Sequence, residues 1–295
     1  MESSYFESRT RLLHEALKQY LNFGKEQPAV LYKAMNYAIF SGGKRLRPIL
    51  FFATYEMLKQ SIEIEQLKPL LPIAIALEMV HTASLIHDDL PALDNSPIRR
   101  GVKSCHLKYD PATAILAGDA LLTKAFEMIS LYDNKEIGVQ IVQLLCNSIS
   151  TRGMIGGQTV DLLSAKKQVL PLSVLEYIHK KKTGALLEAS VKIACACAQA
   201  EPTVTQMLSI YAINLGLAYQ IIDDLLDDDG DYELLGKEQY EDIRNNRTTY
   251  PLIIGHDKAI KMAEKLLDDS YRIIKNMKSN QKLVEFIKLI QDRLP

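Results

Sequence analysis

Two short acidic clusters have the residue types and the spacing to bind a metal ion. The stretch "DDLLDDDGD", residues 223–231, holds six acids in nine positions. Asp223 and Asp227 are four residues apart and would share one face of a helix, with Asp224 beside them and Gln220 three residues earlier. Because like carboxylates repel one another, this arrangement suits a hard divalent cation bound through oxygen. A solvated acidic helix end is the alternative. An EF-hand is excluded, because its loop would begin at a leucine and end at a glycine.

The other cluster, Asp88, Asp89 and Asp94, follows a long apolar segment. His81 lies two helical turns before Asp88 and would share its face, although a histidine in such a segment is often only a core residue. Pro91 cannot continue a regular helix. We therefore expect the chain to bend after Asp89 and to bring Asp94 back towards Asp88.

Cations are concentrated near these acids. "GGKRLRP" contains Lys44, Arg45 and Arg47, "RRG" contains Arg99 and Arg100, and "HKKKTG" adds further lysines. Magnesium uses a carboxylate or two together with phosphate oxygens, and arginine binds phosphate bidentately. There is no GxxxxGKS/T or GxGxxG motif, so a nucleotide-binding fold has no support. The pattern predicts a metal-bound diphosphate with an apolar tail.

The elements that must position these residues are helices. Residues 71–89 are apolar on nearly every side, which is typical of a helix buried in a large core. Residues 206–229 carry a hydrophobic stripe at three- and four-residue steps. Gly and Pro are few and mark breaks between roughly ten helices, and no linker separates domains. We predict an all-α fold, with residues 1–295 forming one bundle of mostly antiparallel helices around a central cavity.

Composition excludes several classes of protein. The 295 residues are 47% hydrophobic and 24% charged, with a formal net charge of −1; a nucleic-acid binder would show a basic excess. The four cysteines have no metal-binding spacing, so we expect reduced, buried thiols in a cytoplasmic protein. The charged N-terminal residues do not resemble a signal peptide, and we expect no membrane-spanning segment.

Several long motifs, in a fixed order along the chain, match the pattern of a known protein family. They are "GGKRLRP", "SLIHDDLPALD…RRG", "LAGDALLTKAF", "GGQTVDL", "HKKKTGALLEAS", "GLAYQIIDDLLD" and "GKEQYEDIRNNRTTYP". From about residue 41 to residue 251 the sequence resembles the trans-isoprenyl (polyprenyl) diphosphate synthases, in particular the bacterial farnesyl and geranylgeranyl diphosphate synthases. The resemblance implies the isoprenoid synthase fold, Mg²⁺ as cofactor and a homodimer.

The resemblance also implies a role for each matching residue. Magnesium is expected at Asp88, Asp89, Asp94, Asp223, Asp224 and Asp227. Isopentenyl diphosphate is expected at Lys44, Arg47, His81 and Arg100. The allylic diphosphate is expected at Arg99, Lys182, Thr183, Gln220, Lys237, Asp242 and Arg247, although Arg247 stands where relatives usually have lysine. These roles imply that Arg99 and Arg100 contact two different phosphates and form no ion pair with the aspartates of the first cluster. The cavity that limits chain length is expected at Ala83, Ser84, Gln158 and Asp161.

The implied reaction is a condensation of an allylic diphosphate with isopentenyl diphosphate. The small residue Ala83, five positions before Asp88, favours a longer, twenty-carbon product, because many farnesyl synthases carry an aromatic residue there. The two extra residues between Asp89 and Asp94 favour farnesyl diphosphate, which is the product we predict, with geranylgeranyl diphosphate as the alternative. A class I terpene cyclase, which would lack the isopentenyl site, a non-catalytic synthase subunit and a helical scaffold are more remote alternatives.

Overall fold

The computed structural model describes residues 5–21, 28–60, 63–164, 170–229 and 248–295. Almost all of these ranges are helical, which confirms the predicted all-α fold. Their contacts divide the chain into two compact units. Unit 1 comprises residues 1–52 and 63–142, and unit 2 comprises residues 53–62 and 143–295. This division does not test the prediction of a single domain, which stays a prediction.

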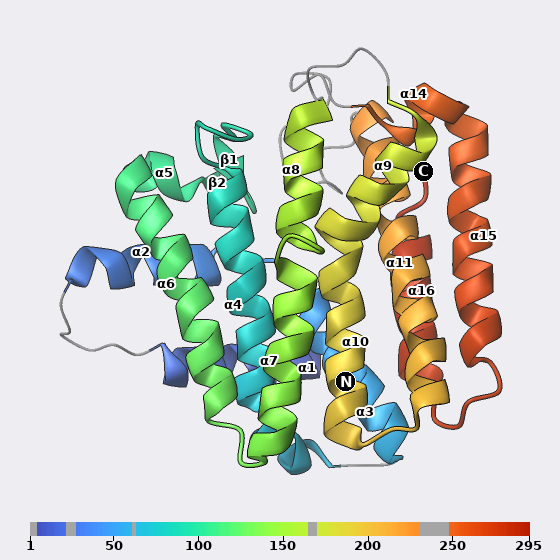
Figure 1. Cartoon of the computed structure of the whole chain (residues 1–295), viewed down its shortest axis with the longest axis horizontal. Helices are drawn as coiled ribbons and strands as arrows, with labels where there is room; N and C mark the ends of the chain where they lie inside the picture. Colours follow the sequence, from blue (N-terminus) through green and yellow to red (C-terminus); the bar gives the residue numbers. More distant parts are fainter. Residues whose placement is uncertain (1–4, 22–27, 61–62, 165–169, 230–247) are drawn as a thin grey trace. The chain divides into compact units, whose positions relative to one another are not determined.

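Unit 1 is built around one buried helix. Its elements are α1 (Tyr5–Tyr20), α2 (Ala29–Phe40), the 3₁₀ helix η1 (Ile64–Leu70), α4 (Leu71–Asp88), α5 (Cys105–Lys108) and α6 (Pro111–Ser130). Helix α4 runs beside α6 and also contacts α1 and α2 (Figure 1). Because α4 is apolar on nearly all sides, it buries most of its residues among these neighbours, as the sequence predicted. Within the described ranges, the segment Ile64–Asp88 is long and apolar enough to cross a membrane, but 72% of its most apolar window is buried inside the protein, as in a core helix.

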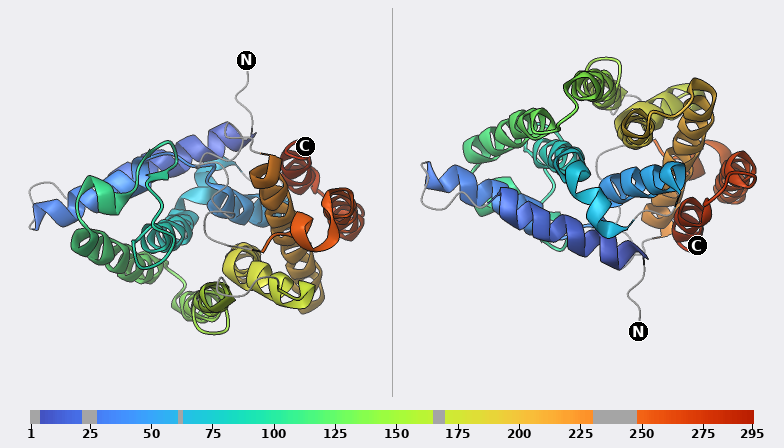
Figure 2. Two further views of the ribbon diagram at one scale, coloured as in Figure 1. Left: turned by 90° about the horizontal axis from the view of Figure 1, so that it is seen from above. Right: turned by 90° about the horizontal axis from the view of Figure 1, so that it is seen from below.

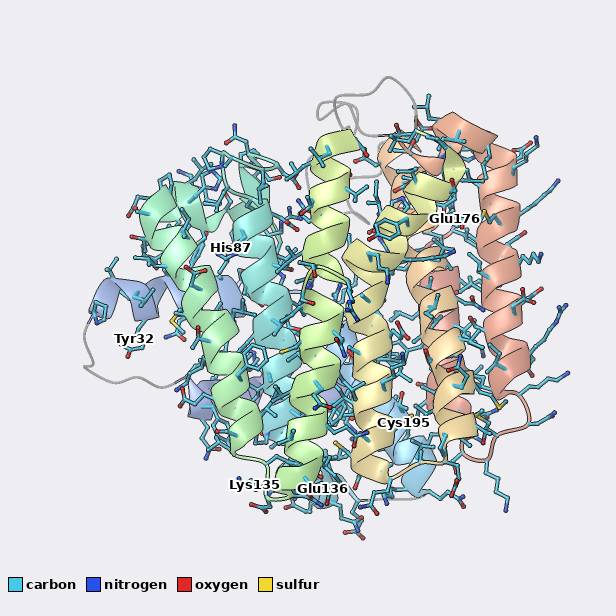
Figure 3. The ribbon with its side chains drawn as sticks, viewed as in Figure 1. Tyr32, His87, Lys135, Glu136, Glu176 and Cys195 are labelled. Atoms are coloured by element: carbon cyan, nitrogen blue, oxygen red, sulfur yellow. The ribbon has the colours of Figure 1, made fainter. Side chains whose placement is uncertain are left out.

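The contact between α4 and α6 is close at one glycine. A Cβ atom on Gly118 would lie 2.2 Å from Nε2 of His87, which leaves no room for any other residue unless the imidazole moves. The His87 ring nitrogen is 3.1 Å from the carbonyl oxygen of Ile115, and Figure 3 labels His87 on this side of α4. The glycine therefore sets the distance between the two helices at the end of α4 that carries the first acidic cluster.

Unit 2 is a second group of helices. Its elements are α8 (Met154–Ser164), α9 (Leu172–His179), the π-helical turn η2 (Lys180–Gly184), α10 (Ala185–Ala198), α11 (Pro202–Asp229), α14 (Tyr250–Ile254), α15 (His256–Ile274) and α16 (Gln281–Gln291). Helix α11 includes the predicted segment 206–229 and contacts α10, α15 and α16 (Figure 2). Helix α15 buries Ala259, Ala263 and Leu267 at four-residue steps, which explains why one face of it packs on α11.

Two helices contribute residues to both units, α3 (Leu46–Lys59) and α7 (Lys135–Ile149). The described residues also contain one short hairpin, β1 (Ile98–Arg99) paired antiparallel with β2 (Val102–Lys103), which the sequence analysis did not predict. The cysteines are free, as predicted, and three of them are buried. The prediction was wrong for Cys146, which is exposed because it lies on the outer face of α7.

Candidate functional site

The first acidic cluster lies where α4 ends. The helix stops at Asp88, and the backbone N–H of Asp94 donates to the carbonyl oxygen of Asp88 at 2.9 Å. The N–H of Asn95 donates to Leu90, with Asn95 in the left-handed region at φ 50°. Pro91 cannot extend the helix, so the chain turns back on itself. The predicted return of Asp94 to Asp88 is confirmed.

The β1–β2 hairpin orients the two arginines that follow. Its two-residue turn consists of Arg100 at φ 55° and Gly101 at φ 77°, which is the geometry of a type I′ turn. Arg99 lies on the strand, and its Nε and Nη2 donate to Oδ1 of Asp89 at 3.0 and 2.6 Å. Asp89 is buried, so this ion pair is largely shielded from water. Asp89, Arg99 and Arg100 line the same small pocket.

Arg100 lies in the turn and contacts a different acid. Its Nη2 donates to Oε1 of Glu78 at 3.2 Å, and Nη1 of Arg45 donates to the same oxygen. Glu78 lies inside α4 and is 0% exposed. The expectation that the two arginines would form no ion pair with the aspartates of the first cluster was therefore wrong for Arg99, which pairs with Asp89, whereas Arg100 pairs with an acid outside that cluster. The sequence analysis also missed Glu78; its signal was a lone acid in an otherwise apolar helix, because a buried carboxylate needs a cationic partner.

His81 lies one turn after Glu78, among arginines. Burial lowers the pKa of His81 well below 6.5, and the charges of Arg47, Arg100, Arg45 and Arg99 lower it further. The structure therefore places three of the four predicted isopentenyl diphosphate residues, Arg47, His81 and Arg100, in one electrostatic neighbourhood, where the imidazole is neutral at pH 7.

Other predicted residues of unit 1 lie around this cluster. Lys44 is exposed, in the loop before α3. Ala83 is 3% exposed and lies inside the core, and the hydroxyl of Ser84 donates to the carbonyl oxygen of His81 at 2.9 Å.

Cys105 lines the same pocket as Asp89. Burial, together with the charge of Asp89, raises the pKa of its thiol to about 11, so Cys105 is no thiolate nucleophile at pH 7.

In unit 2, Asp224 is the centre of a hydrogen-bonded network. Its Oδ1 accepts from Nε2 of Gln220 at 3.2 Å, and its Oδ2 accepts from the backbone N–H of Tyr250 at 3.0 Å. Nε2 of His179 lies 3.4 Å from the same Oδ2, and the imidazole stacks on the ring of Tyr250 with centroids 5.4 Å apart. Asp224 therefore joins α9, α11 and α14, and both of its oxygens already have partners.

The π-helical turn η2 connects this network to α8. The hydroxyl of Thr183 donates to Oε1 of Gln220 at 2.9 Å, and Nζ of Lys182 lies 2.8 Å from Oδ2 of Asp161. A Cβ on Gly157 would lie 2.5 Å from the backbone nitrogen of Lys182, so only glycine lets α8 approach the turn so closely. Single π turns are frequent at functional sites, and the sequence pattern did not predict this one.

Asp223 has a partner that the sequence analysis also missed. Nη2 of Arg293 donates to Oδ1 of Asp223 at 2.6 Å, and its guanidinium lies over the ring of Tyr219, 4.5 Å from the centroid. Burial alone would lower the pKa of Arg293, but Asp223 and Tyr219 leave it raised. This contact spans 70 residues of sequence, so no local pattern could have indicated it.

The remaining predicted residues of unit 2 divide into two groups. Asp227 is buried on α11, and both amide atoms of Gln158 are buried without a hydrogen-bond partner among the described residues. A buried amide without a partner is costly, which is consistent with a contact to a bound molecule. Lys237, Asp242 and Arg247 lie outside the described residues.

The carboxylates fit a cation that takes most of its ligands from elsewhere. Within the described ranges, no three His, Cys, Asp or Glu side chains converge into a group that could hold a metal alone. The backbone bond from Asp94 to Asp88 brings two aspartates to one place, and Asp223 and Asp227 share α11. One or two carboxylates completed by phosphate oxygens and water are the usual ligands of Mg²⁺, not of a structural metal cage.

Three comparisons with known proteins agree with one another. A family model described as polyprenyl synthetase matches residues 28–290. A geranylgeranyl diphosphate synthase of Cyanophora paradoxa is 40% identical over 270 residues, which is 90% of this chain and 88% of that protein. A farnesyl diphosphate synthase of Haemophilus influenzae is 42% identical over 245 residues, 81% of this chain and 80% of that protein. A crystal structure of a geranyltransferase from Helicobacter pylori, complexed with magnesium and isoprenyl diphosphate, has a TM-score of 0.82, with 27% identity over 99% of this chain and 98% of that one.

Proposed function

Because the chain belongs to the polyprenyl synthetase family and is a prenyltransferase, we propose that it makes farnesyl diphosphate. In this reaction an allylic diphosphate, dimethylallyl or geranyl, is condensed head to tail with isopentenyl diphosphate, and diphosphate is released. The relatives named farnesyl diphosphate synthase support this product. The relative named geranylgeranyl diphosphate synthase supports the alternative of one further condensation.

The observation that carries the proposal is a cluster of cations around Glu78 and His81 on α4. Arg45 and Arg100 meet at Glu78, and their charges and that of Arg47 act on His81. The second substrate of a condensation brings its own diphosphate, which needs such a cluster. A terpene cyclase ionises a single diphosphate and has no use for it.

We assign the metal to the two acidic clusters. Asp88 and Asp94, with Asp89 beside them, would hold Mg²⁺ at one cluster. Asp223 and Asp227, with Asp224 beside them, would hold Mg²⁺ at the other, in each case against a diphosphate. Magnesium in such a site stabilises the negative charge that develops on a leaving diphosphate. The relative crystallised with magnesium and isoprenyl diphosphate supports this assignment. The contacts of Asp89 and Asp224 with Arg99 and Gln220 favour a positioning role for these two aspartates.

The chain's own residues then have three tasks. Arg99 in its unit and Lys182 in the other each supply positive charge that would stabilise a leaving diphosphate, so that the allylic C–O bond can break with its electron pair remaining on oxygen. Arg47, Arg100 and neutral His81 hold isopentenyl diphosphate so that its double bond attacks the allylic carbocation. The new carbocation then loses a proton to the released diphosphate and forms the product alkene. The apolar residues of α4 exclude water, which would otherwise capture the carbocation.

Product length is assigned to the residues before Asp88. Ala83 is buried in α4, and we propose that its small side chain lies at the floor of the chain-length cavity. Replacing Ala83 with phenylalanine should shift the product distribution towards shorter chains, as measured by chromatography of dephosphorylated products. Replacing Ala83 with serine serves as the control, because it changes the same position and adds only one atom. An unchanged product distribution in Ala83→Phe would show that Ala83 does not line the floor of the chain-length cavity.

One assay tests the activity against its alternatives. The protein is incubated with dimethylallyl and isopentenyl diphosphates, with Mg²⁺ or with a chelator, and the products are separated by chain length. A C15 product that requires Mg²⁺ supports the proposal, and a C20 product supports the alternative. Cyclic hydrocarbons from a single prenyl diphosphate would indicate a cyclase, and no product would indicate a non-catalytic subunit. Asp88→Ala and Asp223→Ala should each lower turnover by about a hundredfold or more.

We further propose that the protein is a cytoplasmic homodimer. Unit 1 exposes large apolar side chains at Leu107, Ile115, Leu116 and Val139, and a second subunit that covered them would remove this apolar surface from water. The free cysteines are consistent with a reducing compartment. Light scattering should give the mass of two chains, and Leu116→Glu should shift it towards one chain. Cell fractionation tests the compartment.

A further inference from the structure

Glu78 is a buried charge for which the reaction itself gives no role. It is 0% exposed on α4, four residues before Thr82 and ten before Asp88. Its Oε1 accepts hydrogen bonds from Nη1 of Arg45 and from Nη2 of Arg100, the latter at 3.2 Å. An isolated buried carboxylate is costly, so two guanidinium partners on one oxygen account for its presence in the core.

The two arginines are fixed by further contacts. Nη1 of Arg100 lies 3.4 Å from the carbonyl oxygen of Ala38, and Nη2 of Arg45 donates to the carbonyl oxygen of Ile39. A Cβ on Gly43 would lie 2.7 Å from Nε of Arg100, so the guanidinium fits closely against the loop before α3. Each of these contacts limits where the guanidinium groups can move.

The backbone at both arginines is also unusual. Arg45 has φ 52° and Arg100 has φ 55°, a left-handed conformation that costs about 1 kcal/mol or more for a residue with a side chain. Such residues persist only where surrounding contacts hold them. The hairpin turn already requires this φ at Arg100, and Glu78, the group that both side chains share, fixes where the guanidinium groups of Arg45 and Arg100 lie.

We propose that Glu78 is a positioning residue that holds Arg100, and with it Arg45, in the geometry that receives the diphosphate of isopentenyl diphosphate; this rests on the proposed function. Two guanidinium groups so close together repel each other unless an acid lies between them. Burial lowers the pKa of Arg100 and the charge of Glu78 raises it, so the acid also favours the charged form. A group fixed before the ligand arrives loses less entropy when it binds.

A competing electrostatic effect would change the Michaelis constant for isopentenyl diphosphate in the opposite direction. Removing the negative charge of Glu78 would make the cluster more positive and would, by Coulomb attraction alone, tighten the binding of a diphosphate. Releasing Arg100 would weaken binding. A charge-assisted hydrogen bond typically contributes more than a screened charge at longer range, so we expect the loss of position to dominate. Under the proposal the Michaelis constant rises, and under the Coulomb effect alone it falls.

The test compares Glu78→Gln with a matched control. Glu78→Gln should raise the Michaelis constant for isopentenyl diphosphate about tenfold, with the constant for the allylic substrate changed less than about twofold. Calorimetric titration with isopentenyl diphosphate alone should show the same loss of affinity. Glu56 is also a buried glutamate, and it pairs with Lys282 in unit 2. Glu56→Gln should lower stability in the same way and leave both Michaelis constants unchanged.

Two more variants test whether Glu78 acts through Arg100. If it does, Glu78→Gln combined with Arg100→Gln should be no worse for isopentenyl diphosphate than Arg100→Gln alone. Glu78→Asp keeps the charge and should recover part of the affinity; it also provides the test if the glutamine variant does not fold. The proposal is overturned if Glu78→Gln leaves the constant for isopentenyl diphosphate unchanged or lower, or if the double variant is additive. The proposed function fails separately, when the wild-type protein gives no condensation product.

Discussion

Replacing Arg99 with glutamine should lower the free energy of unfolding of the metal-free protein by about 2 kcal/mol. Arg99 makes two hydrogen bonds to one oxygen of Asp89, at 3.0 and 2.6 Å. The Asp89 side chain is 3% exposed, and the Arg99 side chain is 23% exposed. Breaking a fully buried ion pair costs about 3–5 kcal/mol, because it leaves a buried charge without a partner. The partial exposure of Arg99 lets water screen the charge, which brings the expected cost below that range.

A double-mutant cycle with Asp89→Asn isolates the pair. Asparagine carries no charge, so most of the cost of losing Arg99 should disappear in its presence, and the coupling energy should be about 1.5 kcal/mol. Urea unfolding followed by far-UV circular dichroism, in the presence of a chelator, measures all four proteins. Equal m-values would show that the variants unfold from comparable states. A coupling energy below about 0.5 kcal/mol would refute the stabilising role of the Arg99–Asp89 pair and leave phosphate binding as the role of Arg99.

Two further predictions concern helix packing and pH. Gly118→Ala should lower the free energy of unfolding by about 1 kcal/mol, because the cost of displacing the imidazole of His87 exceeds the gain in helix propensity from alanine; an increase in stability would contradict the close contact. Because the pKa of His81 is well below 6.5 in the folded protein, the unfolded chain binds a proton near pH 6.5 that the folded protein does not. The free energy of unfolding should therefore fall as pH is lowered below about 6.5. The pKa values of His14 and His106 are lowered in the same direction, so the slope is compared between wild type and His81→Gln. An equal slope in both would show that His81 is not the source.

Local patterns in the sequence were sufficient for the helices and for the first acidic cluster. The apolar segment 71–89 became α4, and the striped segment 206–229 became most of α11. Pro91 predicted the bend that returns Asp94 to Asp88, because proline limits the backbone wherever it stands. The family and its chemistry followed from long motifs read in order.

The sequence alone was less reliable for the partners of charged side chains. It treated Arg99 and Arg100 as phosphate ligands and did not identify their acidic partners, Asp89 and Glu78. It also gave no sign that Lys182 lies on a π-helical turn, because that turn depends on how closely α8 approaches at Gly157.

The sequence by itself therefore determined the class of fold and the family of reaction, since helical period, turn residues and motif order are local properties of the chain. Only the tertiary structure decided which charges meet. Arg45 is 33 residues from Glu78, and Arg293 is 70 residues from Asp223. No helical spacing relates such positions. The packing of helices around α4 and α11 brings these charges together, and their burial makes each pair matter to stability and to the geometry of the site.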